Sequence, residues 1–463
     1  MKELVIGGFN LDYKSKQSRA EAINCYVEAD DKFYSARRCH GLTSFVDTTE
    51  NAIQSDLLFV DNVVFFVAGN DLYQVDKLGN LTNHGTVGGA GRRFLMANNI
   101  PDDSQVLILN GNGQGYVYQP SVGLALVSDA DFYASSYGSI LNERAYLARD
   151  LTNEFFASAV GDLTDYPTTA FASAETSSDN VVAPIAYKGG MWVLGERTSE
   201  FWQYTGDTTF PLRPVKGAVY ERGCSAVNSV KLCGDVFLFL ADDWTVRMMQ
   251  GQQMEKVSTL AMELDVRTYT RVDDAYSFYC DLTTHKIYYI TFPTAGVTWG
   301  YDMVSGTWHK RQSTGLDYWK INSGIRAWGK TIVGDGESGK LYYLDADSYK
   351  EVADTITCTL RFPSISWTND VTIPLIELDM ETGVGLESGA DPLMRVRYSK
   401  DGGNNYTEHS QMTVGQVGQY GTRVPMRQFG RVVRYRDFVL ELIFTAPVDW
   451  RLYRAWIYDE EGM

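Results

Sequence analysis

The sequence predicts an all-β protein, a six- or seven-bladed β-propeller followed by a C-terminal β-sandwich domain. Three observations lead to this fold class. Short apolar or alternating runs lie between turn residues, and one motif recurs about every 40–50 residues. After Val352 the motif stops and the alternating runs become longer. The aromatic content of 13%, with 29 Tyr and 10 Trp, is typical of half-buried strands, in which large rings pack against their neighbours.

The predicted strands are short runs of apolar or alternating residues bounded by Gly, Asn and Asp, which are common turn residues. Clear examples are Leu57–Val60, Val63–Val67, Val106–Leu109, Val236–Leu240 and Ile287–Phe292. Apolar spacing favours a helix at one place, Val257–Tyr269, where a short helix fits.

The recurring motif is an aromatic or aliphatic strand that ends in a turn. Its seven copies lie at Leu72, Tyr116, Phe155, Phe201, Thr245, Trp299 and Leu341. A period of about 40–50 residues with several strands per period is typical of propeller blades, which bury their sheets by stacking side by side. One or two large β-sandwiches would also give short, regularly spaced strands, and they are the alternative.

The repeats place the propeller at residues 45–352 and leave residues 353–463 for a β-sandwich domain. Longer alternating strands are predicted there at Thr355–Phe362, Ile373–Met380, Leu393–Tyr398, Phe438–Phe444 and Arg451–Tyr458. A tight hairpin turn is predicted at Ser399–Gly403. Residues 1–44 lack the blade pattern, so we expect an N-terminal arm, or a strand that completes a sheet elsewhere.

The chain is acidic, with a formal net charge of −17 and a pI of about 4.8. This charge argues against a basic surface for nucleic-acid binding. Its simplest interpretation is solubility, and its functional interpretation is an acidic wall along which a DNA duplex slides without sticking. No run approaches the 18 apolar residues of a membrane span, and the N-terminus lacks the apolar run of a signal peptide. We therefore expect a soluble protein made in a cytoplasm, without membrane insertion.

Cysteine and histidine patterns predict no metal site. The six cysteines contain no C-x-x-C pair and have no histidine at ligand spacing, so we expect buried thiols in a reducing compartment. They are Cys25, Cys39, Cys224, Cys233, Cys280 and Cys358. The five histidines share no spacing; they are His40, His84, His285, His309 and His409.

No catalytic or cofactor motif stands out, and we expect that the chain is not an enzyme and has no cofactor. G-x-S-x-G, H-E-x-x-H and P-loop motifs are absent. Gly111–Gly115 resembles a phosphate-binding loop but precedes a strand and not a helix, which favours a blade turn. Ser399–Tyr406 resembles the Asp-box of sialidase-type propellers, itself a structural turn. A carbohydrate-binding or sialidase-like propeller protein is the alternative function.

One basic cluster precedes the predicted strand Phe438–Phe444. It comprises Arg423, Arg427, Arg431, Arg434 and Arg436. Its functional interpretation is contact with an acidic partner, another subunit or DNA, and the acidity of the whole chain favours a protein partner. Its structural interpretation is a solvated strand edge, where charges prevent unwanted pairing.

Several segments, in this order, resemble the packaged-DNA stabilisation protein family of short-tailed bacteriophages, the hub or nozzle of the tail. They are Asn24–Tyr26 with Cys39–Thr43, Tyr187–Gly195 with Thr198–Trp202, Gly217 with Glu221–Ala226, and Phe429–Tyr435 leading into Phe438–Thr445. The similarity spans most of the chain, and the last segment is the most specific. The opening departs most, since Cys39 and His40 stand where the family tends to have Phe-Pro.

This resemblance implies a homo-hexameric ring below the portal and its adaptor, the head-to-tail connector. Such a ring would extend the DNA channel, retain the packaged DNA and carry tailspikes or tail fibres. The implied partners also include a tail needle or plug and the genomic DNA, which passes non-specifically through the lumen. The protein would reside in the virion tail after assembly in the host cytoplasm.

Overall fold

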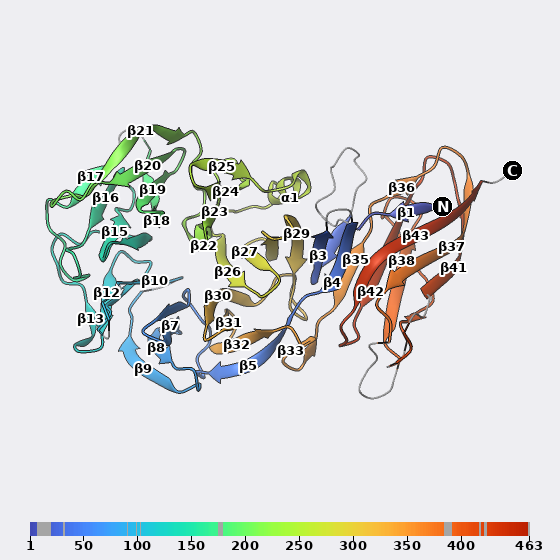
Figure 1. The fold of residues 1–463 in the computed structure, drawn as a ribbon, viewed down its shortest axis with the longest axis horizontal. Coiled ribbons are helices and arrows are strands. Elements are labelled where there is room, and N and C mark those ends of the chain that lie inside the picture. The colour runs from blue at the N-terminus through green and yellow to red at the C-terminus, as the bar shows by residue number, and fades with distance from the viewer. Residues whose placement is uncertain are drawn as a thin grey trace.

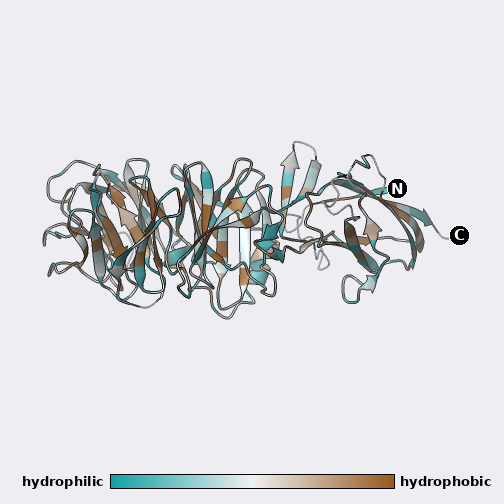
Figure 2. Ribbon diagram, turned by 90° about the horizontal axis from the view of Figure 1, so that it is seen from below, coloured by the Kyte–Doolittle hydropathy of each residue, from teal (hydrophilic) through white to brown (hydrophobic). Residues whose placement is uncertain are grey.

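The computed structural model describes residues 1–6, 20–30, 33–89, 91–98, 100–101, 103–174, 179–383, 391–415, 418–420 and 424–461. The described residues form an all-β structure with one short α-helix and one short 3-10 helix, and a propeller precedes a β-sandwich, as predicted. The two domains lie side by side along the long axis of the molecule (Figures 1 and 2).

The described strands form seven four-stranded antiparallel blades. The first three blades consist of β6 (Leu58–Val60), β7 (Val63–Ala68), β8 (Asp71–Val75) and β9 (Leu81–Thr86); β10 (Phe94–Ala97), β11 (Val106–Leu109), β12 (Gly115–Gln119) and β13 (Gly123–Leu126); and β14 (Gly138–Leu141), β15 (Arg144–Ala148), β16 (Glu154–Ala157) and β17 (Phe171–Ser173).

The next three blades follow the same order from first to fourth strand. They are β18 (Val181–Tyr187), β19 (Gly190–Gly195), β20 (Ser199–Tyr204) and β21 (Leu212–Tyr220); β22 (Lys231–Cys233), β23 (Val236–Leu240), β24 (Val246–Gln250) and β25 (Gln253–Lys256); and β26 (Tyr276–Asp281), β27 (Lys286–Phe292), β28 (Val297–Asp302) and β29 (Thr307–Arg311). The predicted helix is shorter than expected: α1 (Leu260–Val266) begins after Thr259, whose hydroxyl accepts a hydrogen bond from the Met262 amide.

The recurring sequence motif marks the third strand of every blade. Its seven copies lie on or directly before β8, β12, β16, β20, β24, β28 and β32 (Lys340–Asp345). The third strand is paired on both sides and alternates its side chains between the two faces that pack on neighbouring blades. Phe155 on β16, for example, packs edge-on against Trp202 of the next blade with ring centroids 5.0 Å apart.

The seventh blade combines the two ends of the propeller sequence. It consists of β30 (Ile321–Ala327), β31 (Lys330–Asp335), β32 and β5 (Gly41–Asp47). Strand β5 pairs antiparallel with β32, with Leu42 opposite Leu344. The predicted boundary between residues 44 and 45 therefore falls inside a strand. A strand from the first 44 residues does complete a sheet elsewhere, which was the second interpretation of that segment.

The β-sandwich has two sheets that enclose one apolar core. One sheet contains β1 (Lys2–Leu4), β3 (Cys25–Asp30), β4 (Phe33–Arg38), β43 (Arg451–Glu461), β37 (Val371–Met380) and β41 (Val424–Val432). The other contains β2 (Glu21–Ile23), β35 (Cys358–Arg361), β36 (Ile365–Ser366), β42 (Asp437–Phe444), β38 (Leu393–Ser399), β39 (Thr407–Glu408) and β40 (Met412–Thr413). All five predicted C-terminal strands have a counterpart here.

The described part of residues 1–44 does not stand apart from the domains as a separate arm. Strands β1, β3 and β4 belong to the sandwich, and β2 bridges the sandwich and the propeller. The linker after the propeller forms a hairpin of β33 (Lys350–Glu351) and β34 (Asp354–Thr355), and the predicted boundary between residues 352 and 353 lies in its turn.

All six cysteines are buried free thiols. Within the described ranges, the protein has no helix that is long and apolar enough to cross a membrane.

Candidate functional site

The most distinctive region is the junction between the propeller and the sandwich. Strand β2 pairs in parallel with β29 of the sixth blade at Ile23 and Lys310, and antiparallel with β35 of the sandwich. A single sheet of eleven strands therefore runs from the propeller into the sandwich. In the seventh blade, β33 pairs in parallel with the outer strand β5 at Glu351 and Leu42.

A row of alternating charges follows this shared sheet through the sandwich. Arg397 on β38 and Arg361 on β35 both donate to Glu441 on the strand between them, and Arg361 Nη2 lies 2.7 Å from Glu441 Oε2. Glu441 is completely buried. Arg361 Nη1 also lies 2.9 Å from Glu21 Oε2 on β2, its direct cross-strand neighbour. Opposite charges in directly opposed positions stabilise the pairing of strands.

The same row continues into the propeller. Lys310 Nζ on β29 lies 3.5 Å from Glu21 Oε1 and 2.9 Å from Asp265 Oδ2 on α1. The ammonium group also lies 4.7 Å from the ring centroid of Trp299. The row of ion pairs, here called the charge ladder (Arg397, Glu441, Arg361, Glu21, Lys310 and Asp265), therefore links the two domains.

Arg38, at the end of β4, joins three segments at the junction. Its side chain is almost fully buried and donates to four backbone carbonyl groups. The acceptors belong to Tyr349 after the last propeller strand, Ile356 in the linker, and Ala446 and Val448 in the sandwich. Buried carbonyl groups need donors, and one guanidinium with five N–H groups supplies them here.

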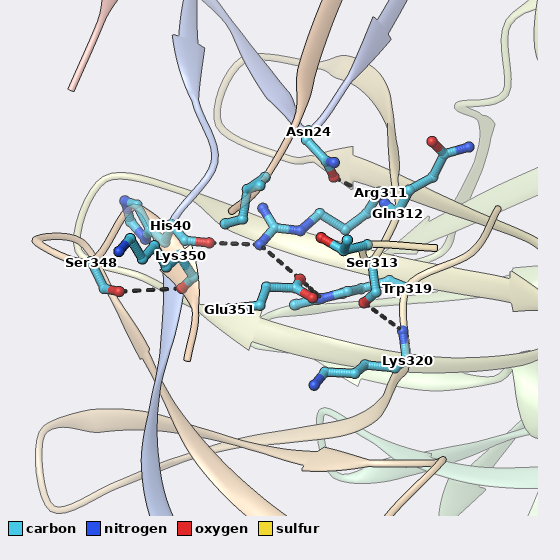
Figure 3. A network of polar contacts seen from close by, with 12 residues as sticks. Asn24, His40, Arg311, Gln312, Ser313, Trp319, Lys320, Ser348, Lys350 and Glu351 are labelled. Carbon is cyan, nitrogen blue, oxygen red and sulfur yellow. Dashed lines mark hydrogen bonds and ion pairs between the residues drawn. The ribbon is translucent and has the colours of Figure 1, made fainter. Parts of the chain in front are cut away.

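A second buried arginine, Arg311, lies at the end of β29 (Figure 3). Its Nη2 donates to the carbonyl of His40 over 2.6 Å and lies 3.8 Å from Glu351 Oε1. Glu351 accepts a 2.8 Å hydrogen bond from the indole of Trp319, and the guanidinium lies 4.6 Å from that ring. Gly41 fits closely beside this network, because a Cβ atom there would lie 2.4 Å from the carbonyl oxygen of Lys350.

Three histidines meet at the junction although they are far apart in the sequence. The Tyr26 ring lies 5.5 Å from His40, 4.4 Å from His285 and 5.3 Å from His309, measured between centroids. The pKa values of His40 and His309 fall to about 3, mainly because burial disfavours the charged ring. Among the residues that the structure describes, no group of three or more His, Cys, Asp and Glu is arranged to hold a metal ion.

His285 differs from these two histidines because it lies between two carboxylates. Its Nδ1 is 2.7 Å from Asp302 Oδ2 in the propeller, and its Nε2 is 3.4 Å from Glu28 Oε1 on β3. Burial lowers the pKa of His285, but the two carboxylates outweigh burial and raise the pKa to about 9. The protonated ring therefore bridges the two domains at neutral pH.

Most of the predicted arginine cluster lies on the edge strand β41 of the sandwich and in the turn that follows it. Arg423 is outside the described residues. Arg427 and Arg431 are exposed on the edge strand β41, and Arg434 and Arg436 lie in the exposed turn to β42. Tyr435, between the two arginines of this turn, is 73% exposed.

Part of the arginine cluster is engaged within the chain. Arg431 forms an ion pair with Asp370, which also accepts a 2.8 Å hydrogen bond from the Arg434 amide. Within the described ranges, the side chains of Arg427, Arg434 and Arg436 form no ion pair.

The two motifs that resembled ligand-binding loops are structural turns. Residues 111–115 connect β11 and β12 within a blade. In the Asp-box-like turn, Asp401 accepts hydrogen bonds from the amides of Asn404 and Asn405 and from the Ser399 hydroxyl. These hydrogen bonds lower the pKa of the Asp401 carboxyl and fix the turn after β38.

Comparison with solved structures finds propeller-containing chains at low identity. The computationally designed Ika8 protein is 12% identical, with a TM-score of 0.39, and the match covers 65% of this chain and 99% of that one. The Pan2 WD40 domain of Neurospora crassa is 9% identical, with a TM-score of 0.43, over 66% of this chain and 96% of that one. BamB from Moraxella catarrhalis is 11% identical, with a TM-score of 0.41, over 72% and 98%.

Comparison with protein families is decisive, although no curated protein matches the chain. Residues 35–349 match the family model described as bacteriophage P22 Gp10, beta-propeller. Residues 365–457 match the model described as bacteriophage P22 Gp10, beta-sandwich. The two models follow each other in the order of the two domains. The chain therefore belongs to the bacteriophage P22 Gp10 family of packaged-DNA stabilisation proteins, structural proteins of the phage tail.

Proposed function

We propose that the chain is the nozzle, or hub, of a short phage tail. In this proposal six copies form a ring below the portal-adaptor protein, extend the DNA channel, retain the packaged genome and anchor tailspikes or fibres. A tail needle or plug would close the ring, and the assembled tail would form in the host cytoplasm. The observation that carries the proposal is the junction, where a shared sheet, the charge ladder and Arg38 join the two domains. A ring subunit that holds back packaged DNA has to transmit force between its domains without hinging.

The distribution of charge supports the channel role. Residues 101–200, which include strands β11 to β19, contain 13 acidic and 4 basic side chains. These blades lie on the side of the propeller opposite the sandwich (Figure 1). An acidic surface repels phosphate groups, so a duplex could pass along this side without binding to it. The ring would then place this side of the propeller toward its axis.

The arginine cluster supports a contact with an acidic partner, a second subunit or a connector protein. The four described arginines lie on an edge strand and an exposed turn, and such positions suit association between proteins. The double substitution Arg434→Ser with Arg436→Ser should leave the chain folded but reduce its incorporation into tails. The matched control is Arg213→Ser, which removes an exposed arginine from the propeller. Equal incorporation of both variants would contradict this contact.

We also propose that the chain acts without catalysis. The two motifs that resemble ligand loops of enzymes are occupied by structural hydrogen bonds or lie in blade turns. Retaining DNA in a phage particle requires contacts between proteins and no chemical reaction. Many carboxylates of this chain are engaged in ion pairs within the fold, in agreement with a structural role.

DNA retention in particles assembled without this chain tests the nozzle proposal. We expect heads that package DNA normally and then lose it, and we expect purified protein to restore retention. Particles that keep their DNA and fail only in adsorption would contradict the proposal, because the chain would then act at the receptor. Negative-stain images of the purified ring should show an open axis and six-fold symmetry.

A further inference from the structure

A pocket at the outer edge of the third blade is smaller than an ordinary ligand site and suits a single side chain. Its volume is about 170 Å³, below the range of about 300–1,000 Å³ that small-ligand sites occupy. Its walls come from the loop before β14, the ends of β15 and β16 with the turn between them, and the residues that lead into β17. Strand β17 pairs only with β16 within the described chain. The pocket therefore lies at an edge that another protein can reach.

The walls of this pocket are mainly aromatic. Tyr133 and Phe156 meet edge-on with ring centroids 5.4 Å apart, and Phe156 lies 5.6 Å from the ring of Tyr166. Phe171, the first residue of β17, lines the pocket and is half exposed. The buried hydroxyl of Tyr166 has no hydrogen-bond partner among the described residues. An aromatic ring with a polar end would pack on these walls and satisfy that hydroxyl.

The segments that form the pocket carry negative charge that no basic side chain neutralises. Five aspartates lie in them and form no ion pair within the described ranges: Asp129, Asp131, Asp150, Asp162 and Asp165. Asp131, which lines the pocket, accepts a 2.7 Å hydrogen bond from the hydroxyl of Thr168. Arg149 also lines the pocket, but it forms an ion pair with Glu154 and adds no net charge. A positively charged partner surface is therefore favoured here.

The turn from β41 to β42 in the sandwich has the complementary composition. Tyr435 stands between Arg434 and Arg436, and neither arginine forms an ion pair within the described ranges. Tyr435 is 73% exposed, and the neighbouring Val433 is also exposed. Tyrosine and arginine are the residue types that often dominate the binding energy of protein interfaces. This turn therefore presents an aromatic ring with a positive charge on each side.

Both surfaces hold an exposed apolar side chain on a residue with left-handed backbone angles. Tyr435 has φ = 59°, and Leu151, in the turn between β15 and β16, has φ = 62°. Residues other than glycine adopt such angles only where the surroundings fix them. The Tyr435 amide donates a 2.8 Å hydrogen bond to the carbonyl of Trp367, and the Thr152 amide donates to the carbonyl of Arg149 over 3.2 Å. Both turns are thus fixed in advance, which reduces the entropy that association costs.

We propose that these two surfaces bind each other in neighbouring copies of the chain, an inference that rests on the proposed ring. The Tyr435 ring of one copy enters the pocket of the next copy, and Arg434 and Arg436 face the aspartates around it. Strands β17 and β41 lie at opposite ends of the molecule, so the contact is head-to-tail (Figure 1). Contacts between two different patches close into rings when the rotation permits. The contact uses the outer edge of the third blade and leaves the other acidic blades open toward the channel.

Two charge-reversed variants of the full-length chain test the contact. The turn variant is Arg434→Glu with Arg436→Glu, and the pocket variant is Asp131→Lys with Asp165→Lys. One variant is immobilised and the other is supplied in solution at low ionic strength, and binding is measured by biolayer interferometry. We expect the two variants to bind each other at least tenfold more tightly than either binds itself, because only the mixed pair brings opposite charges together. Added in equal amounts to heads assembled without this chain, they should form tails that neither forms alone.

A further substitution tests the insertion of the ring. Tyr435→Ala, added to the turn variant, should weaken its binding to the pocket variant about tenfold. The matched control for the charges is Lys77→Glu paired with Asp317→Lys, which reverses two exposed charges in the first blade and before the seventh blade. This control pair should bind each other no more tightly than either binds itself. All the changed side chains lie at the surface, so the unfolding midpoints should stay close to that of the unmodified chain.

Three outcomes would overturn the proposal. The mixed pair binds no more tightly than the like pairs; the control pair gains as much affinity as the mixed pair; or Tyr435→Ala leaves the mixed binding unchanged, in which case no ring enters the pocket. Binding between purified variants does not depend on DNA retention. A failed subunit contact and a failed nozzle role would therefore be told apart.

Discussion

The five blades from β6 to β25 and the two blades at the junction have the same four-stranded topology. They differ in the pairing of their outer strands and in the contacts that stabilise them. In the first group the outer strands β9, β13, β17, β21 and β25 pair on one side only within the described chain, and apolar and aromatic contacts between blades provide the packing. In the second group the outer strands β29 and β5 pair on both sides, and buried charges surround them. The repeat thus builds a propeller, and the charged junction makes the propeller and the sandwich one body.

The largest loss of stability should come from removing apolar packing in one of the five blades from β6 to β25, which we call free blades. Phe155→Ala removes a completely buried ring that packs against Trp202 and Phe210. We expect a loss of about 4 kcal/mol in the free energy of unfolding, measured by urea denaturation. A loss below about 1 kcal/mol would show that neighbouring blades collapse into the gap.

The next effect should come from Arg38 and reach both domains. Arg38→Met leaves four backbone carbonyl groups, two of them in fully buried hydrogen bonds, without their donor, and we expect a loss of about 3 kcal/mol in the free energy of unfolding. Small-angle scattering should show a wider distribution of distances, because the sandwich is no longer fixed to the propeller. The control is Arg213→Met in a free blade, an exposed position that should change neither quantity. A rigid Arg38→Met variant would contradict the role assigned to the junction.

His285 should make the stability of the junction depend on pH. Its pKa in the folded protein is about 9, above the ordinary value near 6.5, so the stabilisation is complete below pH 6.5 and is lost as pH rises through 9. Relative to His285→Gln, we expect the free energy of unfolding to fall by about 1 kcal/mol per pH unit between pH 7 and 9. Parallel pH profiles of the two proteins would show that the bridge between Glu28 and Asp302 is not formed.

The smallest effect should come from interrupting the charge ladder where it enters the propeller. Lys310→Met removes the contacts with Glu21 and Asp265 but retains much of the apolar stem over Trp299. We expect a loss of about 1 kcal/mol that decreases in 1 M salt, because the ion pairs are partly exposed. A loss that is insensitive to salt would assign the effect to packing instead.

The sequence predicted the propeller because every blade repeats one local signal, the third strand with buried residues on both faces. Strand β5 lacked such a signal, since its partner β32 lies at the far end of the propeller sequence. Strand β41 was missed because Pro425, Gln428 and Gly430 interrupt its alternation, and the structure has a bulge there opposite Ile373–Leu375.

The junction was the part that the sequence did not predict. Arg38, Arg311 and Glu441 are buried, whereas charged residues are ordinarily exposed. One signal was available for Glu441, which stands alone as a carboxylate inside the apolar run from Phe438 to Phe444. No spacing rule could have joined His40, His285 and His309, because three separate elements bring them to Tyr26. The arginine cluster was visible because its members are neighbours in the sequence.

The pairing of β5 with β32 has a consequence for synthesis. Leu42 and Leu344 are separated by about 300 residues, and a ribosome adds about 5–20 residues per second, so the first strand waits on the order of tens of seconds for its partner. Until then, the outer strand β5 lacks the three other strands of the seventh blade, and its edge is free to pair with other chains. A truncated messenger RNA would yield a chain whose propeller is not closed. Closure of the seventh blade thus reports that translation has passed residue 345, and only chains of sufficient length would present a complete propeller to the growing tail.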